Sequence, residues 1–224
     1  MSTQGFLDQL LRTAQSALGS SGLTEQRQGG GTGLSDLGKG ALAGGALGLL
    51  LGNKRLRKMG GNVALYGGVA ALGALAYKAY GEWQRGQAGA PAAPPRTVDR
   101  LPGAEAEQHS RAILKALIAA AKADGHVDAR ERGLIEDEMG RLAASDPQLR
   151  EWLAAELERP LDPAEVASVA STPELAAEMY LASLLAVDDQ SYMERAYLDE
   201  LARRMGIDDG LRQRLEAQVR GIGA

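Results

Sequence analysis

Helix-start signals recur through the second half of the chain, and they constrain its fold more than any other feature. At each one, a Ser, Thr or Asp either precedes a proline or stands three residues before a glutamate. Such a residue caps the free N–H groups of a first helical turn, and proline is tolerated at the first helical position. The signals are Asp128 with Glu131, Asp146-Pro147, Asp162-Pro163, Thr172-Pro173 and Ser191 with Glu194.

Apolar residues between these signals recur at helical spacing. Ile113, Leu117 and Ala121 lie on one face of a first helix, which ends near Asp124-Gly125. No convincing alternation of apolar and polar residues indicates a strand. We therefore predict an all-α fold, with a helical bundle of about seven helices over residues 104–224. The remaining helices are predicted over 128–142, from 147, from 163, from 173, over 191–205 and over 208–219.

A faint internal repeat suggests two related helical hairpins. Residues 119–142 and 184–205 share one pattern, in which an apolar helix, an acidic turn and a capped helix follow one another. The acidic turns contain Asp124 and Asp188, which lie 64 positions apart. We predict that a pseudo-twofold axis relates the hairpins and places both acidic turns in comparable positions.

Charge and glycine divide the chain near residue 100. The first hundred residues carry 11 basic and 5 acidic side chains, whereas the rest carries 14 and 24. The first hundred also hold 21 of the 29 glycines, and three prolines at 91–95 favour an extended spacer. We predict an amphipathic helix and flexible linker over 1–37, a glycine-zipper, membrane-associated segment over 38–83, a Pro/Ala-rich linker over 84–103 and the helical domain over 104–224.

The start of the chain predicts a short amphipathic helix. Phe6, Leu7, Leu10 and Leu11 recur on one face, and polar residues occupy the other. Such a helix either packs against the folded protein or lies on a membrane surface or a partner. The sequence leaves these alternatives open.

Glycines repeat at intervals of four residues within an apolar stretch. On a helix they form a groove without side chains, against which another helix packs closely, as in membrane proteins. A second apolar run over 63–80 contains Gly68 and spans about 27 Å as a helix, slightly less than the bilayer core of roughly 30 Å. The predicted partners are membrane lipid and a second copy of the chain; the alternative is a zipper that self-associates in water. The repeated positions are Gly40, Gly44, Gly48 and Gly52.

Two flanking features favour a membrane location. Tyr66, Tyr77, Tyr80 and Trp83 flank the charge-free stretch over 63–76, as aromatic residues do at membrane interfaces. The basic cluster over 54–58 is typical of cytoplasmic loops. We predict a membrane location, reached by a transmembrane helix, a hairpin or a segment that only dips into the inner leaflet. The side that the C-terminal domain occupies stays open, with the cytoplasmic side favoured.

The acidic turns carry a resemblance to a known family. Residues 120–131 read Ala-Ala-Lys-Ala-Asp-Gly-His-Val-Asp-Ala-Arg-Glu, and residues 185–189 and 194–201 carry related motifs. This pattern resembles the TerB-like tellurite-resistance superfamily. Together with the glycine-rich N-terminal half, it is similar to an uncharacterised bacterial inner-membrane family of the YebE type over most of residues 38–219. The resemblance implies an all-helical TerB-like fold, a location at the bacterial inner membrane and a link to envelope or metal stress, but no established activity.

Acidic residues in and beside the two turns are the candidate metal ligands. Their carboxylate oxygens suit a divalent cation such as calcium or manganese, and His126 would add a nitrogen. Acidic residues at these turns are typical of TerB-like proteins. Helix capping explains several of them without a metal, and the spacing of an EF-hand is absent. The candidates are Asp124, Asp128, Glu131, Asp188, Asp189 and Glu194.

Composition and motifs disfavour most enzyme classes. The chain has no cysteine and two histidines, which excludes disulfides, zinc–thiolate sites, iron–sulfur clusters and three-histidine metal sites within one chain. No nucleophile-elbow, metalloprotease or dinucleotide motif occurs. Nucleic-acid binding is disfavoured because residues 101–224 carry a net charge of −10 and aromatic residues are few.

We therefore predict a non-enzymatic, membrane-associated protein of envelope or metal and tellurite stress. Its acidic helical domain binds an unknown protein partner or a divalent cation, and no other cofactor is predicted. The alternatives are a soluble, self-assembling stress scaffold and a divalent-metal sensor or buffer.

Overall fold

Eight α-helices and no strand make up the part of the chain that the computed structural model describes, namely residues 2–20, 68–87, 93–123, 146–187 and 192–222. This confirms the predicted all-α fold class. The helices are α1 (Thr3–Ser20), α4 (Val69–Gly86), α5 (Gly103–Ala121), α7 (Pro147–Glu158), α8 (Pro163–Ala167), α9 (Pro173–Ala186), α10 (Tyr192–Arg204) and α11 (Asp209–Ile222).

Four of the predicted helix starts carry the expected caps. Asp146, Asp162, Thr172 and Asp208 each accept a hydrogen bond from a backbone N–H group of the first turn, at 2.7 to 3.1 Å. Gly206 takes a positive φ of 66° just after α10, as the end of that helix requires. The predicted helix over 128–142 lies outside the described residues, and so does half of the predicted pair of hairpins.

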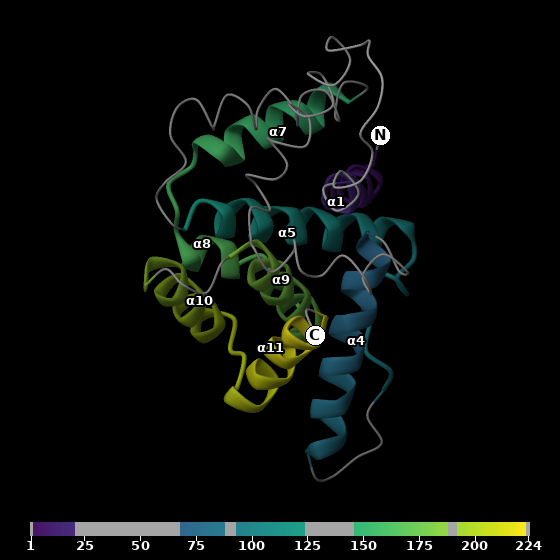
Figure 1. Ribbon diagram of the computed structural model, residues 1–224, viewed down its shortest axis with the longest axis vertical. Helices are drawn as coiled ribbons and strands as arrows, with labels where there is room; N and C mark the ends of the chain where they lie inside the picture. Colours follow the sequence, from purple (N-terminus) through teal and green to yellow (C-terminus); the bar gives the residue numbers. More distant parts are fainter. Residues whose placement is uncertain (1, 21–67, 88–92, 124–145, 188–191, 223–224) are drawn as a thin grey trace, which may run out of the picture.

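Helices α5 and α9 form the centre of the fold (Figure 1). Helix α9 is apolar around its circumference, and Met179, Tyr180 and Leu181 are fully buried within it. Because a helix without a polar face must be surrounded, α9 requires partners on every side. Helices α4, α5, α10 and α11 contact α9, whereas α1, α7 and α8 contact α5.

The predicted amphipathic helix, α1, packs within the chain against α5 and α4. Its first N–H groups are capped by Glu107 of α5, which accepts hydrogen bonds from Thr3 N at 2.5 Å and Gln4 N at 3.0 Å. Burial alone would raise the pKa of Glu107, but these hydrogen bonds outweigh it and lower the pKa. Of the alternatives for this helix, the structure therefore shows packing against the folded protein. The fully buried residues of α1 are Phe6, Leu7 and Leu10.

Helix α4 overlaps the segment predicted to associate with a membrane, and it packs against α9 and α11. Val69, Leu72 and Ala76 are buried in the same core cluster as the residues of α5 and α9. In the described ranges, no helix is both long and apolar enough to cross a bilayer.

The aromatic residues of α4 also have partners within the chain. Trp83 Nε1 donates to the Asp208 carboxylate, with the two oxygens at 2.8 and 3.0 Å, and so ties α4 to the start of α11. Tyr80 packs on Trp83 with a ring-centroid distance of 5.2 Å. The Arg100 guanidinium lies 3.9 Å from the centroid of the Tyr77 ring. These contacts account for three side chains that the sequence placed at a membrane interface.

The end of the predicted linker is fixed against the helices. Thr97 and Val98 are fully buried, and Pro95 is buried beside them. Arg96 forms an ion pair with Glu105 in the first turn of α5. Residues 95–98 are therefore part of the packed structure, although three nearby prolines favoured an extended spacer.

Candidate functional site

Most of the residues that the sequence singled out lie outside the described part of the chain. Only Glu194 and Gly68 fall within it. Cation binding by the acidic turns and self-association through the glycine groove therefore stay predictions. The residues outside are Asp124, Asp128, Glu131, Asp188, Asp189, Gly40, Gly44, Gly48 and Gly52.

Glu194 lies in the first turn of α10, and 7% of it is exposed. A carboxylate in this turn is stabilised by the partial positive charge at the helix N-terminus. Among the residues that the structure describes, no three His, Asp or Glu side chains are grouped to hold a metal ion.

Gly68 forms the N-cap of α4 and brings α1 close to it. Its φ is 81°, which side chains rarely adopt, and a Cβ atom there would lie 2.0 Å from Asp8 Oδ1. The same Asp8 oxygen accepts a hydrogen bond from Val69 N at 3.3 Å. Gly68 thus allows Asp8 of α1 to cap the start of α4.

A sealed polar cluster joins α5, α9 and the segment before α5; we call Val98, His109 and Glu178 the His109–Glu178 cluster. Glu178 is fully buried, and its Oε1 accepts a hydrogen bond from Val98 N at 2.5 Å. Its Oε2 lies 2.6 Å from His109 Nδ1. Burial raises the pKa of Glu178 even though both contacts oppose this shift. Both carboxylate oxygens are engaged by the fold.

A second buried ion pair also begins on α5. Lys115 Nζ lies 3.1 Å from Glu156 Oε1 of α7 and 2.9 Å from Glu165 Oε1 of α8. Arg159 adds a second cation 2.6 Å from the same Glu165 oxygen. Lys115 and Glu156 are both buried. This cluster holds α7 and α8 on α5, and its charges balance within it.

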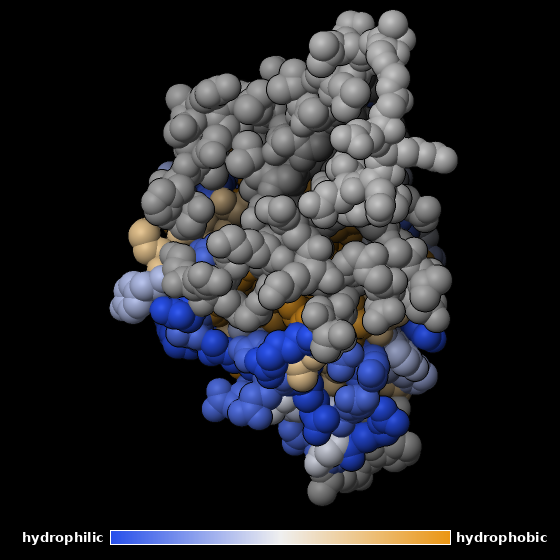
Figure 2. All heavy atoms as spheres, viewed as in Figure 1, coloured by the Kyte–Doolittle hydropathy of each residue, from blue (hydrophilic) through white to orange (hydrophobic). Residues whose placement is uncertain are grey.

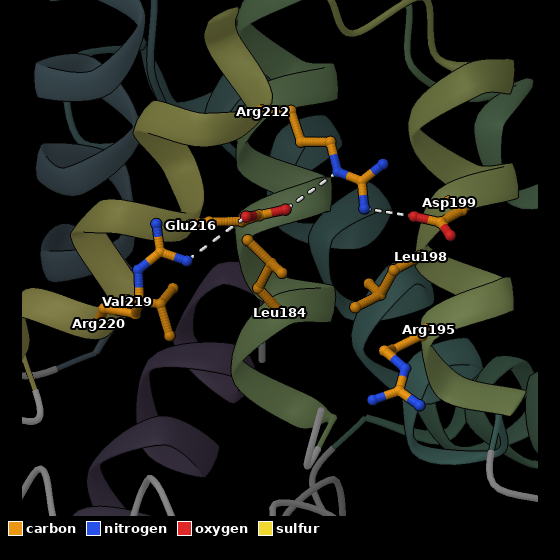
Figure 3. A pocket seen from close by; sticks show the side chains of 8 residues that line it. All are labelled: Leu184, Arg195, Leu198, Asp199, Arg212, Glu216, Val219 and Arg220. Atoms are coloured by element: carbon orange, nitrogen blue, oxygen red, sulfur yellow. Dashed lines mark hydrogen bonds and ion pairs between the residues drawn. The ribbon is translucent and has the colours of Figure 1, made fainter. Parts of the chain in front are cut away.

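An open pocket of about 370 Å³ lies between α9, α10 and α11 (Figure 3). Each helix contributes one buried apolar residue, and none of the three is more than 4% exposed. Five charged side chains complete the lining, and hydrophilic residues cover the surface around α10 and α11 (Figure 2). We call this site the arginine pocket. Its apolar residues are Leu184, Leu198 and Val219, and its charged residues are Arg195, Asp199, Arg212, Glu216 and Arg220.

The charged residues of the arginine pocket bridge two helices. Arg212 of α11 donates through Nε to Glu216 Oε1 at 3.0 Å and through Nη2 to Asp199 of α10. Arg220 Nη1 lies 3.5 Å from the other carboxylate oxygen of Glu216. Three guanidinium groups and two carboxylates line the pocket.

A buried hydroxyl group lies beside these charges. Tyr180 of α9 is fully buried, and its hydroxyl makes no hydrogen bond of standard geometry with the described residues, although it lies against the Arg212 side chain. Burial raises the pKa of Tyr180 to about 12, and the nearby charge of Arg212 opposes the shift.

Sequence reasoning missed the arginine pocket, although part of its pattern is visible. Arg212, Glu216 and Arg220 follow one another at four-residue intervals, as do Arg195 and Asp199. Such spacing puts opposite charges on one helix face, which is equally typical of a solvated helix. Only the tertiary structure brings the two faces together beside buried apolar residues.

The fold and the arginine pocket define an all-α protein with a charged pocket that is open to solvent. The chain belongs to the DUF533 family, proteins of unknown function, which it matches over residues 36–219. It is also 32% identical over 114 residues to the "Uncharacterized protein in ampR 5'region" of Yersinia enterocolitica. That match covers 51% of this chain and 81% of the relative. No solved structure matches the chain.

Proposed function

We propose that this protein is a non-enzymatic, TerB-like helical binding module that recognises a protein partner through the arginine pocket. One observation carries the proposal: the pocket is open to solvent, and it combines buried apolar residues from three helices with five charged side chains. Ligand sites in proteins typically combine an apolar lining with a few convergent polar groups.

The state of the perturbed carboxylates supports binding rather than catalysis. Glu107 and Glu178 each accept hydrogen bonds from the backbone of another segment. Glu200 pairs with Arg203 and Arg204 of its own helix, and these contacts lower its pKa to about 2. A general acid or base must instead reach a substrate. These groups are already engaged in holding the structure.

The TerB-like assignment and the membrane location are further parts of this proposal. The first rests on the motifs at 120–131 and 185–189. The second rests on the four-residue glycine repeat and on the basic cluster at 54–58, which suit helix packing in lipid and a cytoplasmic loop. The resemblance of these motifs to tellurite-resistance proteins is our reason for proposing a role in envelope or metal stress.

Site-specific crosslinking in cells tests partner binding. A photoreactive amino acid at Arg195, an exposed residue of the arginine pocket, should yield a discrete crosslinked complex. The same amino acid at Gln213, an exposed position of α11 outside this pocket, is the matched control. Equal crosslinking from both positions, or none from Arg195, overturns the proposed binding site.

Extraction of the full chain tests the membrane location. The comparison is a full-length variant in which a Gly/Ser linker of equal length replaces residues 40–58, so that α1 and α4 are retained. We expect the natural chain to require detergent and the variant to be released by carbonate. If carbonate releases the natural chain as well, the membrane proposal fails. A large assembly in size-exclusion chromatography would then favour the self-assembling scaffold.

A further inference from the structure

The site that α1 occupies on α4 and α5 is the second surface of the molecule that suits a partner (Figure 1). We propose that this site is an interface between two copies of the chain, in which α1 of one copy docks on α4 and α5 of the other. The surface is separate from the arginine pocket, so the inference does not depend on the proposed function.

Each side of this site caps a helix of the other side. Glu107 of α5 accepts hydrogen bonds from the first backbone N–H groups of α1, those of Thr3 and Gln4. In return, Asp8 of α1 accepts a hydrogen bond from Val69 N, at the start of α4. The first N–H groups of a helix have no partner inside the helix, so both helices gain from this reciprocal capping.

The apolar face of α1 also needs the site. Phe6, Leu7 and Leu10 are fully buried, and they belong to the same core cluster as Val69 and Leu72 of α4. Most of the stability of an amphipathic helix in a protein comes from the packing of its apolar face. Every copy of α1 therefore requires a site of this kind, whether its own or that of a second copy.

Helix α1 is a separate docking segment. The DUF533 family model matches residues 36–219, which include α4 and α5 but not α1. The connection between α1 and α4, residues 21–67, lies outside the described residues. Its 47 residues reach at most roughly 160 Å when fully extended. The connection is therefore long enough for α1 to reach the site of a second copy.

Exchange of α1 between copies keeps every contact of the site. The caps and the apolar packing are the same whichever copy supplies α1, and exchange of an identical element is a low-cost route to a dimer. A long connection also lowers the effective concentration of α1 at its own site. The glycine repeat over 40–52 lies within this connection, and its predicted self-association would bring the α1 of a second copy equally near.

Photocrosslinking between two distinguishable full-length copies in one cell tests the exchange. The first copy carries a photoreactive amino acid in place of Gln4, whose backbone N–H binds Glu107. The second copy carries Gln108→Asn, an exposed position of α5 that lies in the tryptic peptide 101–111 and lowers its mass. We expect position 4 to crosslink to this peptide in both masses, in about equal amounts at equal expression.

Matched variants connect the crosslink with the site. A photoreactive amino acid at Gln9, on the exposed face of α1, should crosslink to peptide 101–111 severalfold less. Glu107→Gln in the second copy should lower its share of the crosslinks severalfold, because the cap loses its charge. Glu105→Gln is the control for this change, since Glu105 lies on the same helix but pairs with Arg96. It should leave the share unchanged.

Three outcomes overturn the inference. Crosslinks confined to the natural mass show that α1 docks only on its own copy. Equal yields from positions 4 and 9, or no crosslink from position 4, show that α1 does not fill this site in cells. An unchanged share in Glu107→Gln shows that the exchange, if seen, does not use the cap. The crosslink from Arg195 tests the arginine pocket separately, so the proposed function can stand where this inference fails.

Discussion

The His109–Glu178 cluster and the arginine pocket contain the same kinds of groups in opposite surroundings. In the cluster, a fully buried carboxylate has both oxygens engaged, one by a backbone N–H and the other by an imidazole. In the arginine pocket, charged groups pair across two helices but stay open to solvent, beside a buried hydroxyl that makes no hydrogen bond of standard geometry. The comparison teaches that sealed polar groups are used entirely to hold helices together, whereas polar groups that stay open to solvent remain accessible to other molecules.

Removing the central carboxylate should have the largest effect. Glu178→Ala leaves the Val98 N–H and the His109 ring without their acceptor inside the core, together with a cavity. We expect a loss of about 3–5 kcal/mol in the free energy of unfolding. Urea denaturation measures it, and Glu178→Gln, which keeps an acceptor oxygen, should lose clearly less. If the two variants are equally stable, the hydrogen bonds do not hold the cluster.

The capping of α4 by α1 gives the next largest expected change. Gly68→Ala places a Cβ atom against Asp8 and requires a residue with a side chain to hold a φ of 81°. We expect a loss of about 1–3 kcal/mol, again by urea denaturation. Gly103→Ala is the control, because no atom lies within 4 Å of its added Cβ. A similar loss in both variants would mean that close approach of α1 does not matter.

The contact between α4 and α11 should cost less to break. Trp83→Phe keeps an aromatic ring but removes the indole N–H that binds Asp208. Because this bond is exposed to solvent, we expect a loss of about 1 kcal/mol in thermal unfolding analysed by calorimetry. In the contrasting variant, Asp208→Asn, the side chain still accepts from the indole, and stability should fall by a smaller amount.

The attachment of α1 should depend weakly on pH. The pKa of Glu107 is lower in the folded protein than its ordinary value of 4.5. The stabilisation that the ionised carboxylate gives to the folded state is therefore fully present above pH 4.5, and it is lost as the pH falls through the pKa of the folded protein. We expect the methyl signals of Leu7 and Leu10 to change below that pH as α1 loosens. Glu107→Gln should remove this acid transition. An unchanged transition in the variant would assign it to another carboxylate.

The smallest expected effect concerns the hydroxyl beside the arginine pocket, in contrast to the buried carboxylate of the His109–Glu178 cluster. Tyr180→Phe removes a hydroxyl that makes no hydrogen bond of standard geometry with the described residues, so stability should change by no more than about 0.5 kcal/mol. Urea denaturation in parallel with Glu178→Ala gives the direct contrast. A loss above about 1 kcal/mol would mean that the hydroxyl is already satisfied.

Local chemistry made much of the fold predictable from the sequence. A cap such as Thr172, followed by Pro173, bonds only to a backbone group three residues away. Such a cap can therefore be recognised from the local sequence alone. The partner of Glu178 lies 69 positions away in His109, and that of Trp83 lies 125 positions away in Asp208. The sequence does not show such distant pairings. The arginine pocket depends on the packing of three helices, which the sequence does not show either, although its Arg212–Asp199 bond spans only 13 positions. For the same reason, the aromatic residues of α4 matched the pattern of a membrane interface, because the sequence does not show their partners within the chain.

The uniformly apolar surface of α9 also has a consequence for synthesis. The ribosome completes α1, α4 and α5 before α9 emerges, so the nascent chain carries the apolar side of α5 without its main cover. A chain that ends before residue 187 never receives this cover. Nonsense mutations upstream of that codon should therefore yield fragments that chaperones retain and proteases remove.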